Sequence, residues 1–160
     1  MKTLWIARHA EAGLNLDDQK RPLTNHGRLQ AQEIGRKWKQ IRPAGLHTIC
    51  SPSTRTLETL HCWDMAPIEQ HTSHIEPEFY LGESMILMRH LCGTNDTIHH
   101  LCLLAHNPGT SDLIQHVTRR QHNLLPGELA EINLDVESWQ EVSEGFGELV
   151  RIFKPQPLSL

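Results

Sequence analysis

The 160-residue sequence lacks the features that mark membrane, secreted and nucleic-acid-binding proteins. It has no run of 18 apolar residues, which excludes a transmembrane helix. The stretch before Arg8 is too short for the apolar segment of a signal peptide, so none is expected. Basic residues number 15 against 19 acidic ones, and a net charge of −4 argues against nucleic acid as a partner.

The cysteines and histidines lack the spacing of metal sites. No Cys-x-x-Cys pair occurs among the four cysteines, and scattered thiols of this kind are typical of a reducing compartment. Among the 12 histidines, the candidates for a metal site form no cluster with a convincing set of partners and are predicted to be surface residues: His61, His71, His74, His99 and His100. We therefore expect a cytoplasmic monomer that uses no metal and no other cofactor.

The order of expected elements indicates one α/β domain over residues 1–160. Short apolar runs predict strands over residues 3–7, 47–50 and 98–105, and amphipathic segments predict helices over 28–41, 54–63, 84–91 and 110–117. In the last third, residues 128–135, 139–142 and 148–153 alternate apolar and polar side chains, which predicts strands. The expected fold is an α/β/α sandwich with a mostly parallel central sheet and an antiparallel C-terminal meander.

Cationic and imidazole side chains follow the apolar strands. The sequence places Arg8 and His9 after the first strand, Arg55 shortly after the second, and His106 with Asn107 after the third. Ligands of α/β sheets bind outside the carboxyl ends of the strands, so we expect these residues to converge. Arg21, at the end of the loop over residues 11–21, can fold back over the same carboxyl ends of the strands.

Such a cluster is suited to binding an anion. Arginine offers forked donors that match phosphate oxygens, and it stays charged when it is partly buried. Positive charge beside His9 should lower the pKa of its imidazole, because like charges disfavour the imidazolium form. A neutral His9 keeps a nitrogen lone pair that can attack phosphorus.

Four segments, in order, resemble the histidine phosphatase superfamily. They are Arg8-His9, Arg21-Pro22-Leu23-Thr24, Ser51-Pro52-Ser53-Thr54-Arg55-Thr56 and Leu104-Ala105-His106-Asn107-Pro108-Gly109. The short length and the start Arg8-His9-Ala10-Glu11-Ala12 are most similar to the SixA-type branch, the phosphohistidine phosphatases. The resemblance spans about residues 2–118 and implies a phosphoglycerate mutase-like fold.

The resemblance also implies roles for the residues at the strand ends. His9 would become phosphorylated, Arg8 and Arg55 would bind the phosphoryl oxygens, His106 would stabilise the transition state, and Arg21 and Asn107 would bind substrate. Water would then hydrolyse phosphorylated His9. Phosphoryl transfer of this kind asks mainly for positioning and charge neutralisation, which the cluster supplies without a metal.

A general acid is the component that the sequence matches least. Glu78 is the best candidate, but the full signature of the phosphomutase branch is missing around it. An alcohol leaves as a strong base and needs a proton, whereas imidazole, with a pKa of about 6.5, leaves more easily. We therefore expect the substrate to be a phosphorylated histidine on a signalling or phosphotransfer protein.

Two other functions are compatible with the same residues. One is a phosphatase for small phosphate esters, which should need an acid such as Glu78. The other is a regulatory module that binds phosphate and has lost turnover, which the intact set of Arg8, His9, Arg55 and His106 argues against.

Overall fold

The computed structural model describes residues 1–63 and 71–157. These residues contain a six-stranded sheet in the order β3-β2-β4-β1-β5-β6. Its strands are β1 (Lys2–Arg8), β2 (Leu46–Cys50), β3 (Thr72–Ile75), β4 (His100–Ala105), β5 (Leu129–Leu134) and β6 (Gly147–Phe153). Strands β3, β2, β4 and β1 pair in parallel, and β5 and β6 add an antiparallel edge. The predicted mostly parallel sheet with an antiparallel C-terminal part is confirmed.

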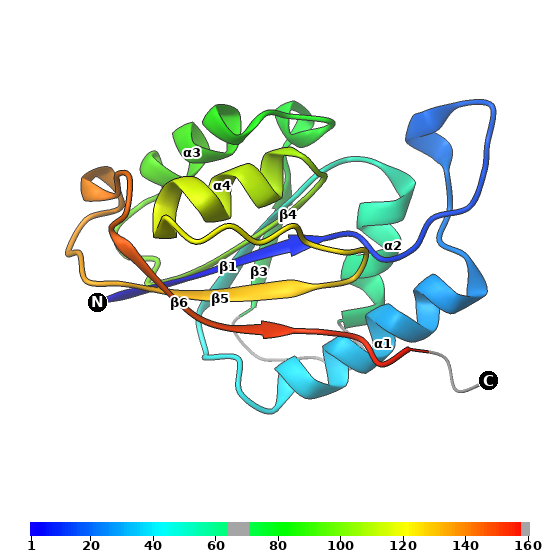
Figure 1. Cartoon of the computed structure of the whole chain (residues 1–160), viewed down its shortest axis with the longest axis horizontal. Coiled ribbons are helices and arrows are strands. Elements are labelled where there is room, and N and C mark those ends of the chain that lie inside the picture. The colour runs from blue at the N-terminus through cyan, green and yellow to red at the C-terminus, as the bar shows by residue number, and fades with distance from the viewer. Residues whose placement is uncertain (64–70, 158–160) are drawn as a thin grey trace.

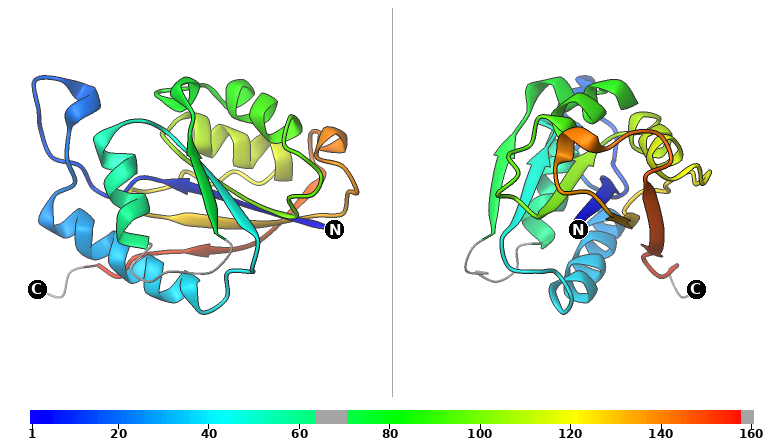
Figure 2. Two further views of the ribbon diagram at one scale, coloured as in Figure 1. Left: turned by 180° about the vertical axis from the view of Figure 1, so that it is seen from behind. Right: turned by 90° about the vertical axis from the view of Figure 1, so that its left-hand side faces the viewer.

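Helices cover both faces of the sheet (Figures 1 and 2). Helices α1 (Asn25–Lys39) and α2 (Thr54–Trp63) cover one face, and α3 (Ser84–Cys92) and α4 (Gly109–Thr118) cover the other. Alternate residues of β1 serve the two cores: Leu4 and Ile6 pack with α3 and α4, while Trp5 and Ala7 pack with α1 and α2. Among the described residues, no helix is long and apolar enough to cross a membrane.

Two elements differ from the expectation. Strand β3 was not expected, because its four residues are exposed at the sheet edge and carry no apolar alternation. The strand expected over residues 139–142 is wrong, because Trp139–Glu141 form a 3-10 helix with a capping box between Ser138 and Glu141. The buried Trp139 ring produced the apolar signal that suggested a strand.

The carboxyl ends of β1, β2 and β4 meet at one edge of the sheet. In Figure 1 this edge lies to the right, where the blue segment after β1 rises away from the sheet and returns to α1. That segment holds a short 3-10 helix, Asp18–Lys20, before Arg21. Side chains from distant parts of the chain are thereby brought to one place.

Candidate active site

His9 and His106 lie side by side just beyond the ends of β1 and β4. These strands are paired so that Arg8 stands opposite Ala105, which makes the next residues neighbours. The two imidazole centroids are 5.3 Å apart, and the residues are 8% and 2% exposed. The predicted convergence of the two histidines is therefore present in the fold.

A main-chain contact sets the orientation of the His9 ring. Its Nδ1 lies 2.7 Å from the carbonyl oxygen of Ala10. A carbonyl can only accept, so Nδ1 carries the hydrogen and Nε2 keeps its lone pair. The loop itself is anchored to α2, because the Ala10 amide donates to the Thr59 hydroxyl. Nε2 is thus the ring nitrogen of His9 that can act as a nucleophile.

Both histidines are held in the neutral form. Burial is the largest cause that lowers the pKa of His9 to about 4; the charges of Arg55, Arg8 and Arg21 act in the same direction, and the hydrogen bond to Ala10 opposes them. Burial also lowers the pKa of His106 to about 3, with added effects from His9 and Arg55. The sequence pointed to the arginine charges, but desolvation is the larger cause.

The site contains buried polar atoms that have no partner in the described part of the chain. They are Nε of Arg8, Nε of Arg55 and Nδ1 of His106. The other nitrogen of His106 is occupied, since Nε2 lies 2.7 Å from the buried Ser51 hydroxyl. Leaving a buried polar group unsatisfied costs roughly 1–3 kcal/mol, so such groups are retained where a ligand pairs with them. Two of these groups are cationic, which favours an anion as the ligand.

Arg21 reaches the site through a carboxylate that the sequence did not single out. Its Nε donates to the Gly13 carbonyl at 2.8 Å, and its Nη1 lies 3.2 Å from Asp18 Oδ1. Asp18 also binds Arg55, whose Nη1 and Nη2 donate to the Asp18 carbonyl oxygen and Oδ2 at 2.8 and 3.2 Å. The loop between Glu11 and Arg21 therefore closes over Arg55, which is only 3% exposed.

Tyr80 is a second residue that sequence reasoning missed. Its ring meets His106 edge to face, with centroids 5.8 Å apart and an interplanar angle of 87°. Its hydroxyl donates to Oδ2 of Asp18. The Tyr80 segment packs tightly on the start of α4, because a Cβ on Gly109 would lie 2.2 Å from the Gly82 oxygen. No periodicity or motif in these two loops signals that they meet.

Asn107 lies beside the site, and its side chain is bound to the protein. Its amide nitrogen donates to the carbonyl of Leu124 at 2.8 Å, and its oxygen accepts from the hydroxyls of Thr110 and Ser111. The same Leu124 carbonyl accepts from Arg8 Nη1 at 3.1 Å. Asn107 therefore supports the segment that holds Arg8, and its direct contact with substrate stays a prediction.

Glu78, the candidate acid, lies in an exposed ion-pair cluster. Its Oε2 accepts from Arg89 and His90 at 2.6 and 2.7 Å. These hydrogen bonds lower the pKa of Glu78, which keeps the carboxylate ionised. Glu76, Glu78 and His90 offer metal-ligand atoms within 4.8 Å of one another, but Oε2 of Glu78 is already paired with Arg89 and hydrogen-bonded to His90.

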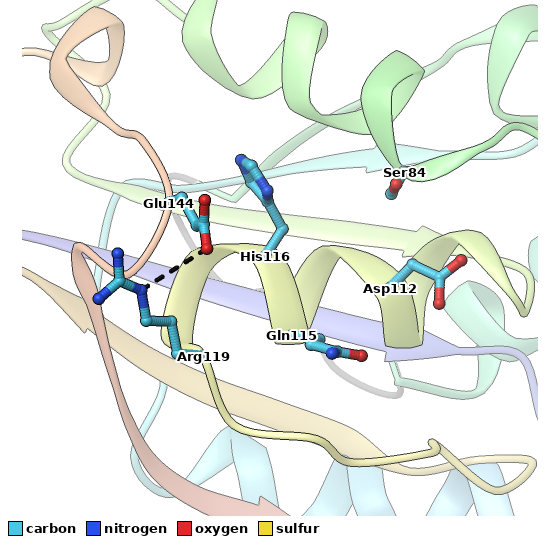
Figure 3. Close-up of a pocket in the computed structure, with 6 residues that line it drawn as sticks. All are labelled: Ser84, Asp112, Gln115, His116, Arg119 and Glu144. Atoms are coloured by element: carbon cyan, nitrogen blue, oxygen red, sulfur yellow. Dashed lines mark ion pairs between the residues drawn. The ribbon is translucent and has the colours of Figure 1, made fainter.

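A hollow of about 520 Å³ lies elsewhere, along α4 near the start of α3 (Figure 3). Its lining in the described chain consists of Ser84, Asp112, Gln115, His116, Arg119 and Glu144. Arg119 and Glu144 form an ion pair across it, with Nε and Oε1 3.6 Å apart. The hollow shares no lining residue with the site around His9.

Comparison with known proteins agrees with this geometry. The family model of the histidine phosphatase superfamily (branch 1) matches residues 4–79. Among curated proteins, none matches the sequence. Several solved structures share the fold across nearly the whole chain.

Three of these structures carry the name SixA, two of which are compared with this chain. One, assigned as a phosphohistidine phosphatase from Nakamurella multipartitia, has a TM-score of 0.87 at 20% identity, with 96% of each chain covered. The other, a protein histidine phosphatase complexed with tungstate, has a TM-score of 0.79 at 21% identity, covering 96% of this chain and 97% of its own.

A phosphoserine phosphatase from Entamoeba histolytica, bound to 3-phosphoglyceric acid, also has this fold. Its TM-score is 0.64 at 14% identity, and the alignment covers 98% of each chain. Likenesses at this level of identity establish a common phosphoglycerate mutase-like fold. The match over residues 4–79 contains three of the four segments that resemble the histidine phosphatase superfamily, and the solved structures share the fold of the chain.

Proposed function

We propose that the protein is a phosphatase that removes the phosphoryl group from a phosphohistidine on another protein, through a phosphorylated His9. One observation carries the proposal. A neutral His9 with its Nε2 lone pair intact lies beside unpaired buried groups of Arg8, Arg55 and His106. This set offers a nucleophile and donors for an oxyanion in one place.

The reaction proceeds in two transfers. In the first, Nε2 of His9 forms a bond to phosphorus while the bond between phosphorus and the substrate imidazole breaks, and that imidazole takes a proton from solvent. In the second, water attacks phosphorus, the bond to His9 breaks, and inorganic phosphate leaves. Arg8 and Arg55 neutralise the phosphoryl oxygens in both steps, which is the main requirement of such transfers.

The carboxylates nearby favour a phosphorus–nitrogen substrate. Glu78 has a lowered pKa because of Arg89 and His90. The hydroxyl of Tyr80, together with Arg21 and Arg55, lowers the pKa of Asp18 to about 2. Neither is therefore protonated at neutral pH to serve an alkoxide leaving group. An imidazole leaving group has a pKa of about 6.5, so its departure depends much less on protonation by a general acid than the departure of an alkoxide does.

Exposed apolar side chains at the mouth of the site favour a protein substrate. Leu14 and Leu16 are 94% and 108% exposed on the loop that carries Asp18. Leu81 follows Tyr80, Leu125 follows the Leu124 carbonyl that holds Arg8, and these leucines are 56% and 57% exposed. Exposed apolar side chains that lie close together are typical of protein-binding surfaces.

The test is phosphate release from a phosphorylated histidine-containing transfer protein. The wild type should release phosphate above the buffer rate and carry an acid-labile, alkali-stable label, and His9→Ala should do neither. Hydrolysis of an aryl phosphate with no release from the phosphohistidine protein would favour the small-ester phosphatase. Phosphate binding without turnover or label would favour the regulatory module.

We also propose a cytoplasmic monomer that acts without a metal and binds no nucleic acid. The four cysteines are free thiols, which suits a reducing compartment. The cationic groups of the site come from the protein itself, so a chelator should leave phosphate release unchanged. Sedimentation analysis would test the monomeric state.

A further inference from the structure

We propose that Asp18 is a positioning residue, which holds the Arg55 guanidinium by its two terminal nitrogens so that Nε–H is left to bind a phosphoryl oxygen. This inference rests on the proposed phosphoryl site at His9. It assigns a task in that site to a residue on the exposed loop, outside the four motifs that indicated the family.

The contacts of Arg55 divide cleanly between the loop and the site. Nη1 donates to the main-chain oxygen of Asp18, and Nη2 pairs with its carboxylate. Nε is buried and has no partner within the described residues. A guanidinium is planar and rigid, so fixing both terminal nitrogens also fixes the direction of Nε–H.

Asp18 is itself held from two other sides. Arg21 Nη1 binds its Oδ1, and the Tyr80 hydroxyl donates to its Oδ2. These contacts come from the end of the same loop and from the segment before α3. The Tyr80 ring in turn rests against His106. Asp18 therefore links Arg55 to the histidine side of the site through Tyr80.

A carboxylate on an arginine could instead occupy the place of the phosphoryl group and be displaced by it. Two observations favour positioning. The shorter of the two contacts to Arg55, at 2.8 Å, is made by the main-chain oxygen of Asp18 and not by its carboxylate. Unpaired groups also remain on Arg55, Arg8 and His106, so a phosphoryl group can bind without removing Asp18.

The two roles predict opposite changes in oxyanion affinity. If Asp18 positions Arg55, Asp18→Ala should weaken tungstate binding by about tenfold or more, the scale of a hydrogen bond to a charged group. Asp18→Asn should recover part of the loss, because its amide oxygen can still accept from Tyr80 and Arg55. If Asp18 competes with the phosphoryl group, Asp18→Ala should tighten tungstate binding.

The experiment is calorimetric titration of tungstate into the full chain. Asp17→Asn is the matched control, since it removes the same charge one residue away and keeps an oxygen for the Gln19 amide that Asp17 caps. Its tungstate affinity should equal that of the wild type. In an Arg55→Ala background, Asp18→Ala should cause no further loss, because it acts through Arg55.

Several outcomes would overturn the inference. One is unchanged or tighter tungstate binding in Asp18→Ala. Another is a loss of tungstate affinity on adding Asp18→Ala to Arg55→Ala that is as large as the loss in the wild-type background. Tyr80→Phe removes one hydrogen bond to Asp18 and should weaken binding in the same direction, which keeps the test decisive if Asp18→Ala does not fold. A wild type that binds no tungstate would remove the proposed phosphoryl site, whereas an active wild type with an unaffected Asp18→Ala would overturn only the role of Asp18.

Discussion

The Nδ1 atom of His9 donates to the main-chain oxygen of Ala10 across 2.7 Å, and this contact selects the other ring nitrogen for chemistry. The Ala10 amide is in turn held by Thr59 on α2, so the loop that presents this oxygen is tied to a helix. Backbone geometry therefore leaves Nε2 as the ring nitrogen of His9 that can act as a nucleophile.

The first prediction concerns the position of the phosphoryl group on His9. Because Nδ1 is occupied by Ala10, the trapped intermediate should be phosphorylated at Nε2. Rapid quenching, alkaline hydrolysis and chromatography against standards of the two phosphohistidine isomers would identify it. The Nδ1 isomer as the main product would contradict the orientation of the ring.

The second prediction concerns Arg55. Its side chain is 3% exposed beside His9, where it can stabilise charge that develops on the phosphoryl oxygens. Arg55→Ala should lower kcat by about 10²–10³-fold, the range for losing one such donor. Arg36→Ala, on an exposed position of α1, is the control and should be as active as the wild type. Equal rates for the two variants would remove Arg55 from the site.

The third prediction is the pH dependence of activity. The pKa of His9 is lowered to about 4, so the nucleophile stays neutral from neutral pH down to about pH 5. For an aryl phosphate, kcat/KM should be flat in this range once substrate ionisation is corrected. It should fall about tenfold per unit below the pKa of His9, as protonation removes the lone pair. A fall that begins near pH 6.5 would mean that His9 is not desolvated.

The same pKa shifts predict how stability depends on pH. Unfolded histidine titrates near 6.5, whereas folded His9 and His106 titrate at about 4 and 3. Between these values the unfolded chain binds more protons, so the free energy of unfolding should decrease as the pH falls below about 6.5. Urea unfolding of the wild type and of His106→Asn would check this, because the variant should lose less stability between pH 7 and pH 5.

The fourth prediction separates the two substrate classes through Glu78. With its carboxylate held by Arg89 and His90, Glu78 should not donate a proton to the leaving group. Glu78→Gln should therefore change phosphohistidine hydrolysis less than about threefold, as a surface substitution would. Glu83→Gln, an exposed residue with no side-chain cap hydrogen bond, is the control. Fast ester hydrolysis by the wild type that is lost in Glu78→Gln and kept in Glu83→Gln would favour the ester phosphatase.

The fifth prediction concerns the exposed leucine side chains around the proposed site. Leu16→Ser should raise KM for a phosphohistidine protein and leave hydrolysis of an aryl phosphate unchanged, because the Leu16 side chain is fully exposed and should contact only a large substrate. Phe146→Ser removes a 53% exposed ring next to β6, at the opposite end of the sheet, and should alter neither reaction. Equal loss of both activities in Leu16→Ser would indicate damage to the site and not to docking.

The parts of the site that were predictable are those at strand ends. Arg8, His9 and His106 directly follow buried apolar runs, whose position in a sheet is set by hydrophobic pattern. Arg55 is the second residue of α2, which starts shortly after β2, so its placement is nearly as constrained. Local pattern and sheet topology together suffice for these residues.

Asp18 and Tyr80 were not predictable for a physical reason. They meet across 62 positions of sequence, and each sits in a short 3-10 segment or beside one, where side-chain direction has no period. Their meeting depends on how tightly the Tyr80 turn packs on Gly109. The exposed strand β3 was missed for a related reason, since an edge strand without an apolar face carries little pattern.

The separation of His9 and His106 follows from the pairing of β1 with β4 described above. Neighbouring strands lie about 4.8 Å apart, and the two rings stand 5.3 Å apart one residue beyond a matched pair. The distance between the His9 and His106 rings is thus set by the spacing of paired strands in the sheet. Substitution of the exposed Leu16 and Leu81 side chains leaves this pairing in place, whereas Asp18 and Tyr80 on the same loops contact Arg55 and His106. A change of substrate in the proposed reaction is therefore best sought in the exposed leucine side chains and not in replacement of whole loops, because the same loops carry Asp18 and Tyr80.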